Sequence, residues 1–157
     1  MERQLGELQW HWLYRDFLEA YAQCPADDLW IETYSQKYLR PHARLLNSLH
    51  FSPKGFSTEE QVLERMTRLG RRHFSPLVQA IQRPDAYEAT LKDMAQQFLT
   101  ALRHHPHHRD VYVIVGLDCT NIYSLVDHER NISVLCLESV QGQLEEARLL
   151  LAHEIHH

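Results

Sequence analysis

Three residues at the end of the chain have the types and the spacing of a hydrolytic metal site. They are His153, Glu154 and His157, which spell H-E-x-x-H. On an α-helix, residues four apart lie on the same face one turn apart, so both imidazoles can converge on one metal ion. The carboxylate of Glu154 lies beside them, where it can take a proton from water without ligating the metal. This spacing predicts a Zn²⁺ site with Glu154 as general base.

The helix that the motif requires is predicted independently by the residues before it. Residues 143–152 contain neither Pro nor Gly and are rich in strong helix formers. Leu149, Leu150, Leu151 and Ile155 are spread around most of the helix circumference, which predicts a helix buried inside the domain. The alternative is a solvated, frayed, His-rich terminus.

The motif supplies two ligands, whereas catalytic zinc sites take three protein ligands and a water. In a site built on this motif the third ligand normally comes from further along the chain, but the chain stops at His157. We therefore expect a fragment of a longer protein; a third ligand from upstream or from another subunit is the alternative. A buried helix that ends here leaves its last carbonyls and its apolar face uncovered, which favours association with another chain.

A second group of histidines competes for the metal. The tract His104-His-Pro-His-His108 contains four imidazoles, but Pro106 prevents them from lying on one helical face. Such a tract is usually a solvated loop, and its metal affinity is nonspecific. Zinc bound by the protein could therefore sit on this tract instead of on the terminal helix.

The composition limits the classes of protein to which the chain can belong. The chain of 157 residues is 44% hydrophobic and 24% charged, which is typical of one soluble globular domain. A formal net charge of -5 argues against nucleic acid as a partner. There is no apolar run of about 18 residues and no secretory signal, so no membrane is expected. Three widely spaced cysteines, Cys24, Cys119 and Cys136, fit reduced thiols, and we expect a cytoplasmic location.

The first two thirds of the chain, residues 1–108, predict a layer of about four to five helices. Apolar residues from Leu5 to Tyr21 recur at three- and four-residue steps, predicting one helix that ends near Cys24-Pro25. Ser57-Thr-Glu-Glu60 is typical of a capping box, in which Ser57 begins a further helix. No repeat or linker divides the chain, so 1–157 is expected to be a single domain.

Residues 109–157 change from a helical to a strand-like pattern before the motif. Val111–Val115, Asn121–Val126 and Ile132–Leu137 predict three strands. Turn residues at 127–131 favour an antiparallel hairpin between the last two. The fold class predicted is therefore α+β: a helical layer, a small three-stranded sheet and a buried helix with H-E-x-x-H.

These residues resemble a known group of enzymes. Strand, hairpin and then Leu149-Leu-Leu-Ala-His-Glu-Ile-His-His157 are similar to the N-terminal part of a zincin metallopeptidase domain. Within that clan the chain is most similar to a bacterial family of largely uncharacterised Zn-dependent proteases, in which several helices precede a short sheet and an (L/A)-A-H-E-x-x-H helix. The resemblance covers about the last 45 residues, in which a predicted helix carries the motif. It implies a zincin-like fold, Zn²⁺ held by His153 and His157, and peptide hydrolysis with Glu154 as general base.

The expected partner is a peptide or protein substrate. An extended peptide can add to a free sheet edge by main-chain hydrogen bonds. The strand near Asn121–Val126 is the edge that we expect to be used, which makes Asn121, Ile122, Tyr123 and Ser124 candidate substrate-binding residues. Such binding reads the peptide backbone more than its side chains, so the sequence does not predict which peptide is cut.

Two other functions compete with the peptidase. One is a non-catalytic helical binding or regulatory module, in which Trp10, Trp12 and Tyr14 form part of a partner surface and the terminal histidines do no chemistry. Aromatic side chains more often fill a core, and that is where we expect these three. The other is a zincin-like fragment that is inactive, with zinc held loosely by two ligands.

Overall fold

A computed structural model describes residues 8–50, 58–102, 110–116, 122–127 and 130–156 of the chain. Of these, the side chains of residues 47–50, 59, 102, 122–127, 130–131 and 154–156 fall outside the description. The described segments form an α+β fold with N-terminal helices, a sheet that contains three parallel strands, and a C-terminal helix. The α+β class that the sequence predicts is thus confirmed.

Helices make up most of the chain before residue 103. They are α1 (Tyr14–Gln23), α2 (Trp30–Tyr34), α3 (Ala43–His50), α4 (Glu59–Leu69), α5 (Ser75–Ala80) and α6 (Pro84–Leu102), with short 3-10 turns at Asp27–Leu29 and Arg71–Phe74 and a π-helical segment at Ser35–Leu39. At the start of α4, the hydroxyl of Thr58 accepts from Gln61 N at 3.2 Å. The N-cap of α4 is therefore Thr58, whose backbone is extended as a cap requires, while Ser57 lies outside the described residues. No helix in the described ranges is both long and apolar enough to cross a membrane.

The sheet has four strands in the order β1-β2-β4-β3. Their bounds are β1 (Gln9–His11), β2 (Asp110–Ile114), β3 (Ile122–Asp127) and β4 (Arg130–Cys136). β1, β2 and β4 run parallel, while β3 pairs with β4 in the antiparallel sense. The predicted hairpin between the last two strands is confirmed, and β3 forms one edge of the sheet.

Strand β1 corrects two expectations. The sequence predicts three strands and a single helix from Leu5 to Tyr21, whereas residues 9–11 form a fourth strand and α1 begins only at Tyr14. The strand is stabilised by β2: His11 Nε2 lies 2.8 Å from Asp110 Oδ1, and the His11 ring stacks on Tyr112 with centroids 4.1 Å apart. Local periodicity cannot detect a partner so distant in the chain.

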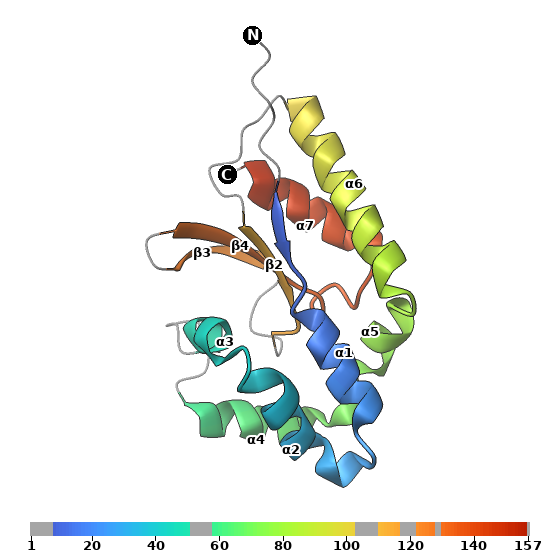
Figure 1. Ribbon diagram of the computed structural model, residues 1–157, viewed down its shortest axis with the longest axis vertical. Helices are drawn as coiled ribbons and strands as arrows, with labels where there is room; N and C mark the ends of the chain where they lie inside the picture. The colour runs from blue at the N-terminus through green and yellow to red at the C-terminus, as the bar shows by residue number, and fades with distance from the viewer. Residues whose placement is uncertain (1–7, 51–57, 103–109, 117–121, 128–129, 157) are drawn as a thin grey trace.

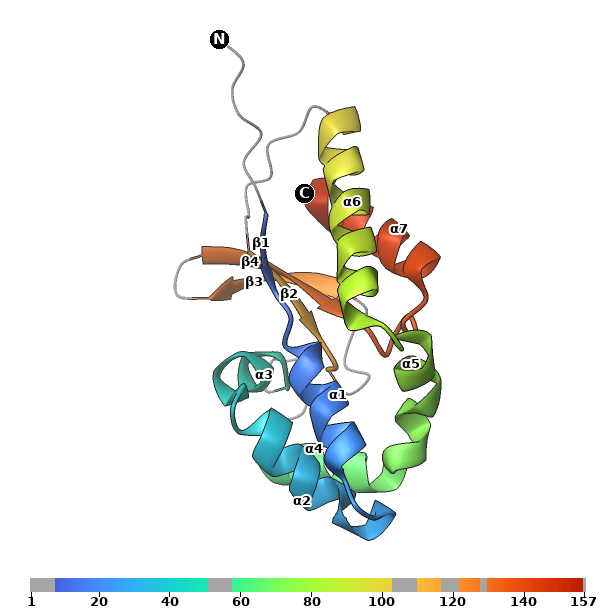
Figure 2. The ribbon, with the colours of Figure 1, turned by 45° about the vertical axis from the view of Figure 1, so that its right-hand side comes forward.

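Helices cover the sheet on one face and at one end. α6 and α7 (Leu144–His156) pack against each other, and α7 also contacts β3 and β4. Figure 1 and Figure 2 show these two helices on the same side of the sheet, with α1 to α4 gathered beyond the end at which β1 and β2 finish. The motif helix therefore belongs to the layer on the sheet, apart from the N-terminal helices.

An aromatic cluster forms the centre of the helical part. The ring of Phe17, which is fully buried, contacts Trp30 at 5.6 Å, Tyr38 at 5.5 Å and Phe74 at 5.1 Å, all in edge-on geometry. Edge-to-face packing of this kind is the favoured arrangement of aromatic rings. The hydroxyl of Tyr38 then reaches the sheet, where it donates to Val115 O and accepts from Val115 N, both at 2.9 Å. The helical part and the sheet thus share one core.

Candidate functional site

The turn between β4 and α7 fixes where the motif helix begins. Gly142 has φ +70°, and its N–H donates to Leu137 O at 3.0 Å. A Cβ at position 142 would lie 3.0 Å from Ala80 Cβ and 3.2 Å from Ile81 Cγ1. Only glycine combines a left-handed backbone with so close an approach. The turn is therefore packed tightly against the end of α5, and α7 starts from a fixed point.

Helix α7 presents one face to the fold and another to solvent. Ala147 and Leu151 are fully buried, whereas Leu149 is 70% exposed. The guanidinium of Arg148 lies 5.5 Å from the ring centroid of Phe98 on α6 and 3.5 Å from a Glu145 carboxylate oxygen. The expectation of a helix buried on all sides is therefore wrong. Neighbouring leucines are alike in sequence, and only the packing on the sheet and α6 decides which of them is covered.

The motif residues can be placed relative to the buried and the exposed face of α7. His153 is exposed and lies four residues after Leu149, on the same face of α7. The backbone of Glu154 belongs to α7, three residues after the buried Leu151, and its side chain is outside the description. His157 lies outside the described residues. The helix that the motif requires is thus confirmed through His156, while the metal site itself stays a prediction.

The candidate substrate strand lies next to the motif helix. Ile122, Tyr123 and Ser124 belong to β3 and pair with Leu135, Val134 and Ser133 of β4. β3 is the last strand of the sheet in the described structure, so its second edge has no strand partner there. It also contacts α7. Asn121 lies outside the described residues. Three of the four candidate positions are therefore placed on an edge strand beside the helix that carries the motif.

Metal-ligating groups do not cluster elsewhere in the described structure. Among the residues described there, no group of three or more His, Cys, Asp or Glu side chains could hold a metal ion. The tract at 104–108 lies outside the description, as do the side chain of Glu154 and the whole of His157. Both metal positions therefore stay predictions.

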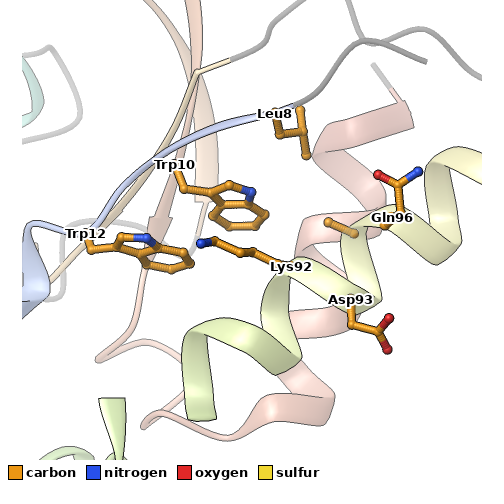
Figure 3. Close-up of a pocket in the computed structure, with 7 residues that line it drawn as sticks. Leu8, Trp10, Trp12, Lys92, Asp93 and Gln96 are labelled. Atoms are coloured by element: carbon orange, nitrogen blue, oxygen red, sulfur yellow. The ribbon is translucent and has the colours of Figure 1, made fainter. Parts of the chain in front are cut away.

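A concave site lies between β1 and α6. It has a volume of about 530 Å³, with Trp10 and Trp12 on the side of the strand and Lys92 and Gln96 on the side of the helix (Figure 3). Of the three aromatic residues that the sequence places in the core, Tyr14 is fully buried, but Trp10 and Trp12 are half-buried and line this cavity. Sequence reasoning missed Lys92, because no local signal links an exposed lysine to a distant tryptophan.

No family model, curated protein or solved structure matches the chain. The resemblance to zincin peptidases therefore rests on the motif and on the elements that precede it.

Proposed function

We propose that the chain carries two zinc ligands and the general base of a metallopeptidase domain, which takes a third ligand from outside the motif. The observation that supports this most is the H-E-x-x-H sequence, of which residues 153–156 lie on α7, a regular helix that contacts the edge strand β3. His153 and His157 are the proposed ligands, and Glu154 is the proposed base. An outermost strand next to a helix that binds a metal is the arrangement that an extended peptide substrate needs.

The residues present fit a zinc ion. α7 is helical from Leu144 to His156, and a spacing of four residues on a helix corresponds to about one turn. The side chain of His153 is exposed. Imidazole nitrogen is among the preferred ligands of Zn²⁺. These features support zinc more than a hard cation such as Mg²⁺, which prefers oxygen ligands.

The chemistry that Zn²⁺ supplies in such sites is Lewis-acid activation of water and of a carbonyl group. Glu154 accepts the proton of the attacking water and delivers it to the leaving amine. The edge of β3 that has no strand partner among the described residues would pair with the main chain of the peptide and hold the scissile bond in an extended conformation. Main-chain pairing of this kind selects extended segments and tolerates many side chains.

The metal assignment is tested by the zinc content of the full chain and of its His153→Ala variant. We expect near-stoichiometric zinc in the wild type and its loss in the variant, measured by elemental analysis after dialysis. His73→Ala is the matched control, since His73 is also exposed but lies outside the motif. The tract at 104–108 is intact in both variants. Zinc that persists in His153→Ala would refute the assignment, and a zinc-free wild type would favour the non-catalytic binding module.

The base assignment is tested with Glu154→Gln. General bases contribute about 10²- to 10⁴-fold to rate, so we expect turnover to fall by at least about 10²-fold. Zinc content should not change, because the carboxylate is not a ligand. The measurement is cleavage of a complex peptide mixture, followed by mass spectrometry, with elemental analysis of the same preparations. Full hydrolytic activity in Glu154→Gln would exclude this role for Glu154.

A further inference from the structure

The cavity between β1 and α6 has a preformed aromatic wall. Trp10 lies on β1, and Trp12 follows the last residue of that strand. Their rings are parallel within 6°, with centroids 4.9 Å apart. The Trp12 ring also meets the fully buried ring of Tyr14 edge-on at 6.2 Å, which fixes its orientation. The indoles are half-buried, so part of their surface remains open to the cavity.

The opposite wall brings one positive charge to these rings. Figure 3 shows Lys92 extending from α6 toward Trp12, and its Nζ lies 5.5 Å from a Trp12 ring centroid. No carboxylate of the described residues forms an ion pair with Lys92. Asp93, which also lines the cavity, points away from the indoles (Figure 3), and its carboxylate accepts from Gln97 Nε2 at 2.8 Å. The charged group that faces the indoles is therefore the ammonium of Lys92, which lies over the ring of Trp12.

We propose that this cavity binds a small aromatic carboxylate. Its ring would stack on the indoles, and its carboxylate would pair with the ammonium of Lys92. The volume of about 530 Å³ is within the range of small-molecule sites. The amide of Gln96, one helical turn from Lys92, can donate to a second oxygen of the ligand.

This site is separate from the proposed peptidase site. β1 and β3 are the two outermost strands in the order β1-β2-β4-β3, so the cavity lies at the opposite edge of the sheet from the proposed substrate strand. Binding there depends neither on zinc nor on Glu154. The proposal therefore stands or falls independently of the catalytic one.

The chain offers an internal control for a binding experiment. It contains three tryptophans, and Trp30 is only 1% exposed within the aromatic cluster around Phe17. We would titrate the full chain with 2-naphthoate and follow the three indole N–H signals by ¹H–¹⁵N NMR. The signals of Trp10 and Trp12 should shift with one common Kd, while that of Trp30 should stay in place.

Charge and ring are tested separately by ligand and by variant. Lys92→Met keeps the length of the side chain and should weaken 2-naphthoate binding by about tenfold or more, since a bond to a charged group is lost. It should leave binding of the neutral 2-naphthalenemethanol unchanged. Trp12→Leu should weaken both ligands. Lys37→Met is the matched control and should change neither, because Lys37 is exposed on the Ser35–Leu39 segment and donates to Gln23.

Three outcomes would overturn the proposal. One is equal affinity of wild-type protein for the acid and the alcohol, which would remove the role of Lys92. Another is a set of shifts that includes Trp30 as strongly as Trp10 and Trp12, which would indicate nonspecific binding. The last is absence of binding at millimolar 2-naphthoate.

Discussion

At the scale of single residues, Tyr38 joins the helical part to the sheet. Its hydroxyl satisfies both backbone groups of Val115, the residue that follows β2, and both residues are fully buried. Buried N–H and C=O groups need partners, because burying them unsatisfied costs free energy. The hydroxyl oxygen of Tyr38 thus makes the two hydrogen bonds that a neighbouring strand would otherwise make with Val115. The Ser35–Leu39 segment that carries Tyr38 is therefore tied directly to the end of β2.

Removing this hydroxyl should destabilise the protein. Tyr38→Phe leaves Val115 N and O buried without their partner, and we expect a loss of about 1–3 kcal/mol in the free energy of unfolding. The measurement is urea denaturation followed by circular dichroism. Tyr21→Phe is the control: its hydroxyl pairs with Ser75 Oγ at 2.9 Å, both residues are half-buried, and water can replace the bond. Equal losses in the two variants would contradict this role for Tyr38.

At the scale of elements, the start of α7 depends on the contact between Gly142 and α5. Gly142→Ala adds a Cβ to a left-handed residue and places it 3.0 Å from Ala80 Cβ. Backbone strain and overpacking together should cost about 2–4 kcal/mol in the free energy of unfolding. Thermal or urea unfolding measures the loss.

A double-mutant cycle separates the contact from the backbone strain. Ala80→Gly removes the atom that a Cβ at position 142 would meet, so it should recover part of the loss in Gly142→Ala. Gly70 is the control: it has φ +67°, but nothing lies within 4 Å of a Cβ built there. Gly70→Ala should therefore show no coupling to Ala80→Gly. Absence of coupling at position 142 would mean that the contact with α5 does not limit this turn.

The sequence predicts those elements that are determined by residues close together in the chain. The helix formers before His153 predict α7, and the extended runs on either side of residues 127–131 predict the hairpin of β3 and β4. β1 could not be predicted in this way, since its strand conformation depends on pairing with β2. Nor could the covered face of α7, because Leu149 and Leu151 are the same residue type and differ only in what packs on them. The site is predicted less completely than the fold: Lys92 meets Trp12 only through the packing of α6 on β1.

At the scale of the whole molecule, three buried tyrosines make the free energy of unfolding depend on pH in the alkaline range. Burial raises the pKa of Tyr14, Tyr38 and Tyr87 above the ordinary value of about 10, and Glu88 raises that of Tyr14 further. The folded protein therefore binds more protons than the unfolded chain above that pH. The stability that these neutral phenols contribute is complete below about pH 10 and is lost as pH rises toward their folded pKa values.

We therefore expect the free energy of unfolding to fall steeply above about pH 10. The measurement is an alkaline titration that follows tyrosinate absorbance and circular dichroism on the same sample. The absorbance of the buried tyrosines should appear together with the loss of helical signal, because the phenols ionise when the core opens. Full ionisation of all seven tyrosines with an unchanged helical signal would contradict this expectation.

The pairing of β1 with β2 also sets an order of events in folding. Gln9 pairs with Asp110, so closing the sheet joins the two ends of a loop that contains α1 to α6. Contacts so distant in sequence form slowly, and on the ribosome they cannot form before β2 has been synthesised. The nascent helices therefore fold before residues 9–11 can pair with β2. The Trp10 and Trp12 indoles stay exposed during that interval, so the cavity that they line is among the last features of the protein to be completed.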